Sequence, residues 1–340
     1  MSTPAIWPRH VRFFEAYNAW RDSDEGAELR EAGVSTDFLN YSANTLGRRL
    51  MQVYRETPSI WNTYTATYSV PDFKAQNFVG VTEGEDLVMF REGGTYFDSK
   101  IAERVGASLT VDTYGRTFSI TRKALINDDL GLLRDVPGRM GRSAARTLAR
   151  SVVAKLESNP NGYDSVATFH ASHANLITDA LSETGLGNAA LQFNQMVDDN
   201  GNPITLRGQQ LVIPPALEIT ARRILNSTEI HIQGSGSTPA YGQGNLNPMQ
   251  GYAPYAVERY FSDANNWYLF ADPNEAPVLA VGFLNGQQTP QIMLKDPGMR
   301  LVLGGNDPYS MEFDEIAWKV RLEWGTAMVD WRGAVFANVA

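Results

Sequence analysis

The pattern of apolar and polar residues predicts strands in separate parts of the chain. Aromatic and β-branched side chains dominate 61–70, and the run at 267–270 has the same character. A short apolar run at 211–213 stops at two prolines, which is typical of a buried strand. Near the C-terminus, apolar side chains alternate around Trp324 and Val335. We therefore expect C-terminal strands that return to the main body.

The clearest helix is expected over 135–158. Pro137 suits its first turn, and the Asn-Pro-Asn-Gly sequence at 159–162 should end it. At about 100° per residue, its apolar side chains form one stripe, which consists of Met140, Ala144, Leu148, Val152 and Leu156. Four arginines fall on the opposite face, namely Arg139, Arg142, Arg146 and Arg150. This row is either a solvated helix face or a contact surface.

Three shorter helical patterns surround this long one. The first follows a cap at Ser35–Asp37 and ends at Arg48-Arg49, and the second covers about 188–197. The third begins at Pro214-Pro215. Its inward positions are Leu217, Ala221, Ile224 and Leu225, and its outward positions are Arg222 and Arg223.

Three segments interrupt the regular patterns. Tyr114-Gly115 resembles a turn, and 198–201 is a strong turn signal. Residues 232–256, rich in Gly, Gln, Ser, Asn and Pro, predict a long loop. Residues 71–100 are too long for a turn and too poor in apolar residues for a core, so we expect a two-stranded excursion supported from elsewhere.

The excursion is also strongly acidic. Between Glu83 and Asp98 it carries five acids and one base, Arg91. The excursion, with Glu83, Glu85 and Asp86 among its acids, is therefore opposite in charge to the arginine row of the long helix.

Composition narrows the class of protein. A length of 340 residues with 43% hydrophobic residues allows a sizeable core, in two to three compact units or one elaborated domain. The absence of cysteine excludes disulfides and thiol catalysis. A net charge of −9 argues against a nucleic-acid-binding protein whose surface is basic overall. No apolar run approaches the roughly 20 residues of a membrane span, and the N-terminus has no secretory pattern.

Catalytic patterns are weak. His170, His173 and His231 could in principle supply three metal ligands. The pattern, however, lacks the glutamate that zinc peptidases place between two histidines on a helix. The carboxylates of Asp128 and Asp129 are better explained by a helix cap. The chain has no nucleophile elbow, P-loop or dinucleotide fingerprint. We therefore expect no catalytic, cofactor or metal site, and no enzyme.

Several segments, in collinear order over about 30–340, resemble the major head subunits of tailed double-stranded DNA bacteriophages, especially the Mu-like branch. They are Tyr114–Phe118 with Ile120–Leu130, Phe169-His170 with His173–Leu176, Leu211–Glu218 with Ala221–Leu225, Gly244–Pro248 and Trp267–Pro273. The resemblance implies an α+β fold with an N-terminal arm, an extended loop, a peripheral domain built on a spine helix, and an axial domain.

The implied organisation can be placed on the sequence. It comprises an arm at 1–60, an extended loop region at 61–117, a peripheral domain at 118–206, an axial domain at 207–305 and C-terminal peripheral strands at 306–340. The resemblance implies a subunit that builds an icosahedral head from hexamers and pentamers of itself and encloses DNA without reading its sequence. It also suggests that the extended loop lies over a neighbour's spine helix, which makes Glu83, Glu85 and Asp86 candidates to meet the arginine row across that interface. Such a head assembles in the bacterial cytoplasm. Implied partners are a separate scaffolding protein, a portal and a possible decoration protein, without a membrane.

Two alternatives remain open at this point. An encapsulin-like compartment would share the fold, and particle images with or without a portal and tail distinguish it. A metal-dependent hydrolase is a different class, which elemental analysis for a stoichiometric metal would test.

Overall fold

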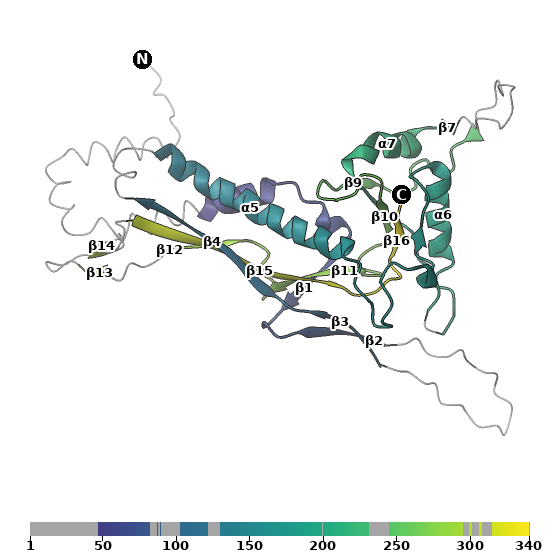
Figure 1. The fold of residues 1–340 in the computed structure, drawn as a ribbon, viewed down its shortest axis with the longest axis horizontal. Coiled ribbons are helices and arrows are strands. Elements are labelled where there is room, and N and C mark those ends of the chain that lie inside the picture. Colours follow the sequence, from purple (N-terminus) through teal and green to yellow (C-terminus); the bar gives the residue numbers. More distant parts are fainter. Residues whose placement is uncertain are drawn as a thin grey trace, which may run out of the picture. The chain divides into compact units, whose positions relative to one another are not determined.

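The structure is a computed structural model that describes residues 47–81, 87, 89, 103–121, 130–198, 200–230, 245–294, 299–300, 306–307 and 315–339 (Figure 1). The chain divides into two compact units. Unit 1 consists of Met1–Thr57, Gly115–Ala144 and Thr289–Leu322, and unit 2 of Pro58–Tyr114, Ala145–Gln288 and Glu323–Ala340. Helices and sheets are both present, so the expected α+β class is confirmed.

In unit 2, one sheet is built on β11 (Leu279–Leu284). The short η1 (Trp61–Thr63) leads into β1 (Thr65–Val70), which pairs with β11 in parallel. The C-terminal half of β15 (Glu315–Met328) pairs with β11 in antiparallel orientation. The strand predicted within 61–70 is thus confirmed.

A second sheet of unit 2 has the order β5-β16-β10-β6-β9. These strands are β5 (Leu176–Ile177), β16 (Ala334–Ala337), β10 (Trp267–Phe270), β6 (Gln210–Ile213) and β9 (Tyr255–Val257). All four residues of β10 are buried, because both faces of this central strand are covered. The predicted strands at 211–213, 267–270 and around Val335 are confirmed.

Two helices pack on this second sheet and complete its core. In α7 (Glu218–Asn226), which η3 (Pro215–Leu217) precedes, Ala221, Ile224 and Leu225 are buried as predicted. α6 (Glu183–Asn194) buries Leu186, Ala189 and Phe193 in the same cluster. The prediction of this helix at 188–197 was wrong by several residues, because Ser182 caps it earlier by accepting a hydrogen bond from the Gly185 N–H at 3.0 Å.

The acidic excursion begins and ends as a two-stranded ribbon. β2 (Gln76–Val81) pairs antiparallel with β3 (Glu103–Leu109), as predicted. The expected support from elsewhere is already present at its base, where Phe78 packs on Tyr68 with ring centroids 5.0 Å apart and on a buried cluster that includes Leu109. Between these strands only Leu87 and Met89 are described, and both are exposed.

Unit 1 contains a helix at 47–56, the N-terminal part of α5 (Leu130–Glu157) and further strands. β12 (Gln291–Leu294) pairs antiparallel with β15, and β13 (Met299–Arg300) with β14 (Asn306–Asp307). β4 (Asp112–Thr121) also pairs with β15. In this unit the rings of Phe118 and Trp318 stack with centroids 5.2 Å apart.

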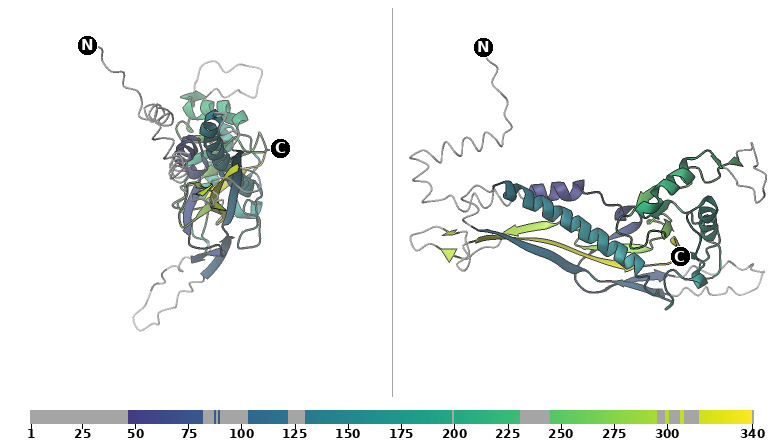
Figure 2. Two further views of the ribbon diagram at one scale, coloured as in Figure 1. Left: turned by 90° about the vertical axis from the view of Figure 1, so that its left-hand side faces the viewer. Right: turned by 45° about the horizontal axis from the view of Figure 1, so that its top comes forward.

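The helix α5 confirms the predicted long helix with one correction (Figure 2). It begins at Leu130 and not at 135, so Pro137 lies inside the helix. Proline removes one backbone hydrogen bond from the helix, and Pro137 is itself buried. Of the predicted stripe, Leu148, Val152 and Leu156 are buried and Met140 and Ala144 are half-buried.

Two further predictions were wrong for reasons of tertiary contact. Tyr114-Gly115 is not a turn, since β4 runs straight through it; a Cβ on Gly115 would lie 2.8 Å from the Val320 carbonyl oxygen of β15. The glycine thus permits a close strand approach. The helix expected to end at Arg48-Arg49 continues to residue 56, because Leu50 and Val53 are buried on its inner face. Its expected cap at Ser35–Asp37 lies outside the described residues.

The glycine-rich segment at 232–256 is only partly a loop. Residues 231–244 lie outside the described residues, but 245–257 include β8 (Asn245–Leu246), paired with β7 (Glu229–Ile230), and β9. Asn247 orders the turn between them by donating hydrogen bonds to the carbonyl oxygens of Ile224 and Ser227. Among the helices that the structure describes, none has the length and apolarity to cross a membrane.

Candidate functional site

The predicted arginine row lies on the exposed face of α5. Arg139, Arg142, Arg146 and Arg150 are all exposed, opposite the buried stripe, because they fall within one angular sector of the helix. The guanidinium of Arg150 lies over the ring of Tyr260, 5.4 Å from its centroid. The predicted acidic counterparts, Glu83, Glu85 and Asp86, lie outside the described residues. Their pairing with the row therefore stays a prediction.

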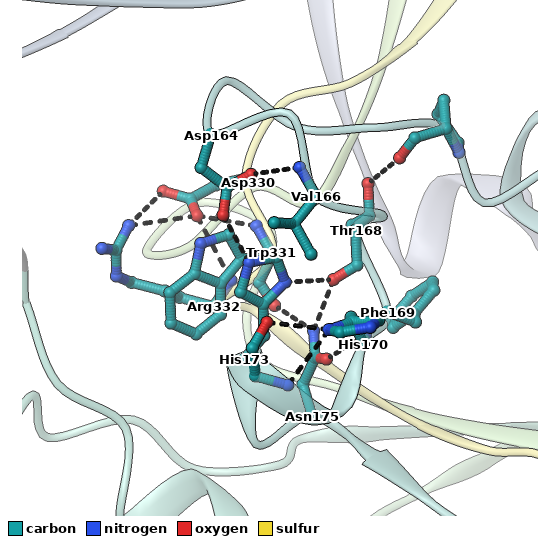
Figure 3. A network of polar contacts seen from close by, with 12 residues as sticks. Asp164, Val166, Thr168, Phe169, His170, His173, Asn175, Asp330, Trp331 and Arg332 are labelled. Atoms are coloured by element: carbon teal, nitrogen blue, oxygen red, sulfur yellow. Dashed lines mark hydrogen bonds and ion pairs between the residues drawn. The ribbon is translucent and has the colours of Figure 1, made fainter.

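His170 and His173, which were considered as metal ligands and judged unsuited, belong to a network of polar contacts in unit 2 (Figure 3). His173 is buried, and its Nε2 lies 2.6 Å from Asp164 Oδ2. Its Nδ1 lies 3.1 Å from the Thr168 carbonyl oxygen. That oxygen also accepts a hydrogen bond from the Asn175 side chain at 2.8 Å. Both ring nitrogens of His173 therefore face protein acceptors.

The short contact with His173 bears on the carboxyl group of Asp164, which is the acceptor on this side of the network. Burial raises the pKa of Asp164, but hydrogen bonds from His173 and from the Val166 N–H outweigh it and lower that pKa overall. Because both ring nitrogens of His173 already contact protein oxygens, neither is turned toward a metal site.

The network ties together segments that are far apart in the sequence. The Trp331 ring stacks on His173 with centroids 4.5 Å apart and an interplanar angle of 4°, and the Arg332 guanidinium lies 4.4 Å from the Trp331 ring centroid (Figure 3). Asp330 pairs with Arg332 at 3.2 Å. Asn175 also donates to the Trp331 carbonyl oxygen at 3.1 Å. The segment after α5 is thereby fixed to the turn before β16, which indicates a structural role.

The remaining predicted ligand, His231, lies outside the described residues, and so do Asp128 and Asp129. Within the part of the chain that the structure describes, no group of three or more His, Cys, Asp or Glu side chains is placed to hold a metal ion. His170 is exposed, and its Nδ1 accepts from the Ser172 N–H at 3.1 Å. It caps the short helical turn at Ala171–His173.

Sequence reasoning missed a buried carboxyl group at Glu258. Only 3% of this residue is exposed. One oxygen accepts from the Tyr260 N–H at 3.2 Å and the other from the Tyr64 hydroxyl at 3.4 Å. Burial raises the pKa of Glu258, and the charge of Glu157 adds to this effect, although the hydrogen bonds oppose it. The folded surroundings therefore favour protonation of this carboxyl group more than the unfolded chain does.

In the unmodified protein, the free energy of unfolding should fall as the pH rises and Glu258 ionises. We expect Glu258→Gln to remove this part of the pH dependence. Because the folded-state pKa is raised, the favourable contribution of protonated Glu258 is complete below its unfolded pKa and is lost as pH rises through the folded value. Urea midpoints measured from about pH 4 to about pH 8 should fall more steeply for the unmodified protein than for the variant. The exposed Glu275→Gln is the control and should leave the curve unchanged. Parallel curves for all three proteins would contradict the expectation.

The chain was compared with known proteins by sequence. A family model for phage capsid protein matches residues 105–337, which is more than half of the chain. The chain belongs to the phage capsid protein family. None of the curated protein sequences matches this capsid protein.

Solved structures show the same fold. The capsid protein is similar to a chain of the capsid structure of cyanophage P-SCSP1u, with a TM-score of 0.56, 12% identity, and coverage of 84% of this chain and 89% of that chain. A chain from Mycobacterium phage Patience gives a TM-score of 0.51, 12% identity and coverage of 91% of both chains. A chain from Gordonia phage Cozz gives 0.52 and 13%, with coverage of 83% and 86%. Identities this low show the fold alone.

These comparisons confirm the expected capsid fold and make the protein a structural head subunit. They favour a phage head over the encapsulin-like alternative.

Proposed function

We propose that this capsid protein assembles, as hexamers and pentamers of itself, into the icosahedral head of a tailed phage and encloses double-stranded DNA. The match to phage capsid proteins over residues 105–337 carries the proposal. The proposal includes the localisation, which is the virion head after assembly in the bacterial cytoplasm. It includes no enzymatic activity, since the family's role is structural.

The finer assignments belong to the same proposal. The segments quoted above support the Mu-like branch. They also support an arm at 1–60, an extended loop region at 61–117, a peripheral domain at 118–206 with C-terminal strands at 306–340, and an axial domain at 207–305. Separate scaffolding and portal proteins and a possible decoration protein are proposed partners. The DNA is enclosed without sequence-specific contacts and without a membrane.

Contacts between subunits are proposed to include the arginine row. The exposed guanidinium groups of Arg139, Arg142, Arg146 and Arg150 would meet the acids of a neighbour's extended loop, Glu83, Glu85 and Asp86. Each exposed pair contributes at most about 1 kcal/mol and weakens with salt. Weak contacts repeated around a capsomer add up while single ones remain reversible, which lets misplaced subunits leave during assembly.

The test of the proposed function is assembly of the full chain. We expect the expressed protein to form closed shells, tubes or capsomers, because the apolar side chains of Leu87 and Met89 on the extended loop are exposed in the single chain. Negative-stain electron microscopy and analytical ultracentrifugation measure this directly. A compact monomer at every salt and protein concentration would refute the proposal.

A further inference from the structure

A cavity opens in unit 2 among α7, β7, the start of α6 and the turn after β8. Its volume is about 420 Å³. The buried part of its lining includes Leu181 and Ile224, whereas Arg223 and Glu229, which are opposite in charge, are exposed at its edge. A hollow that is apolar inside and mixed in charge at its edge suits an apolar side chain better than a polyanion.

Leu246 of β8 is an exposed apolar side chain that faces away from this cavity. The next residue, Asn247, lines the cavity and donates hydrogen bonds to the carbonyl oxygens of Ile224 and Ser227. The pairing of β8 with β7 continues through Asn247, whose N–H donates to the Thr228 carbonyl oxygen at 3.0 Å. Successive side chains of a paired strand point to opposite faces, so Leu246 is turned outward and is 79% exposed. It cannot fill the cavity of its own chain.

The sequence around Leu246 carries no charge. No Asp, Glu, Lys or Arg occurs at 230–257, although 20% of the residues of the whole chain are charged. In a ring of identical subunits, a charged side chain near the centre faces the same charge on every other copy, which is repulsive. An uncharged segment avoids this repulsion, whereas a contact with DNA would need basic residues. The pattern therefore favours a second copy of this chain as the partner that covers Leu246.

Closed rings also need two different surfaces on each subunit. One patch of a subunit meets a different patch of the next, so a projecting group requires a matching hollow on the same chain. Leu246 and the cavity form such a pair, since both belong to unit 2 and neither is covered by the described part of its own chain. We infer that Leu246 of one subunit inserts into the cavity of the next subunit around a hexamer or pentamer. The inference rests on the proposed function and adds to it one contact that closes the ring.

This contact differs physically from the pairing proposed for the arginine row. Leu246 is uncharged, so burial of its apolar surface drives the contact, and dilution of salt should not strengthen it. Charge reversal at the edge of the cavity, for example at Arg223, should leave the contact intact for the same reason.

Cross-linking of assembled shells tests the contact directly, because the chain has no cysteine of its own. Thr220 lines the cavity. In the full chain with Leu246→Cys and Thr220→Cys, a short bis-maleimide should join each subunit to the next and give a ladder of bands up to pentamers and hexamers on denaturing gels. The matched control combines Leu246→Cys with Leu191→Cys, an exposed position on α6 outside the cavity lining, and should give no ladder.

Assembly provides the second measurement. Leu246→Ser should raise the protein concentration needed for half-maximal assembly about 10-fold or more, whereas Leu246→Met should assemble like the unmodified chain. Because Leu246 is exposed, neither substitution should shift the urea midpoint.

The outcomes separate this inference from the proposed function. Cross-linked dimers alone would indicate a two-fold contact and overturn the inference, and so would equal ladders from the test and control pairs or normal assembly of Leu246→Ser. Shells of the unmodified chain, together with no ladder from the test pair, would overturn the inference and leave the proposed function standing. Absence of shells from the unmodified chain would refute both.

Discussion

Reversing the charge of Arg142 and Arg146 to glutamate should prevent the capsid protein from assembling. Both side chains are exposed in the middle of the arginine row, whereas Arg150 already lies over Tyr260. Under the proposed charge pairing, reversal would turn two attractive contacts with a neighbour's acidic loop into repulsive ones, a change of roughly 2–4 kcal/mol per subunit interface. Light scattering and electron microscopy at fixed protein concentration measure the loss.

Compensating substitutions distinguish this effect from misfolding. Basic residues at Glu83, Glu85 or Asp86 should restore assembly of the reversed protein, because they recreate pairs of opposite charge. Arg222→Glu with Arg223→Glu on α7 carries the same charge change outside the row and should assemble normally. If the protein with reversed Arg142 and Arg146 builds normal shells, the proposed charge pairing fails even though the capsid fold stands.

Gly325→Ala should produce a large loss of folding stability. Gly325 is buried in β15, where it pairs with Gly282 of β11. A methyl group there would overlap the carbonyl oxygen of Thr110, a backbone atom that cannot move aside like a flexible side chain. We expect a cost of about 3 kcal/mol or more, measured as a lower midpoint of thermal or urea unfolding.

The control for this substitution is Gly187→Ala in α6. The nearest atom to a Cβ at that position is the Met249 methyl, at an ordinary contact distance of 3.6 Å. Alanine favours a helix interior over glycine by about 1 kcal/mol, so this variant should be as stable as the unmodified protein or more stable. Similar losses in both variants would show that close backbone packing at Gly325 is not the cause.

Local sequence patterns determined the elements whose buried side chains form a helical stripe or a continuous apolar run. The apolar stripe of α5, the inward face of α7 and the strand β10 follow from side chains within a few residues of one another. Those patterns are decided by helix and strand geometry, so the sequence alone predicts them. The collinear segments also carried the family resemblance, which the match over residues 105–337 confirms at the level of phage capsid proteins.

Tertiary structure decided the features that depend on residues far apart in the chain. Pro137 inside α5 and Gly115 inside β4 looked like boundaries, because proline and glycine often end elements; neighbouring backbone, such as Val320 beside Gly115, decides otherwise. The Asp164–His173–Trp331–Arg332 network joins side chains from two distant segments, so no local signal could reveal it. The burial of Glu258 beside Tyr64 is likewise set by packing, since a side chain's environment depends on whatever the fold brings next to it.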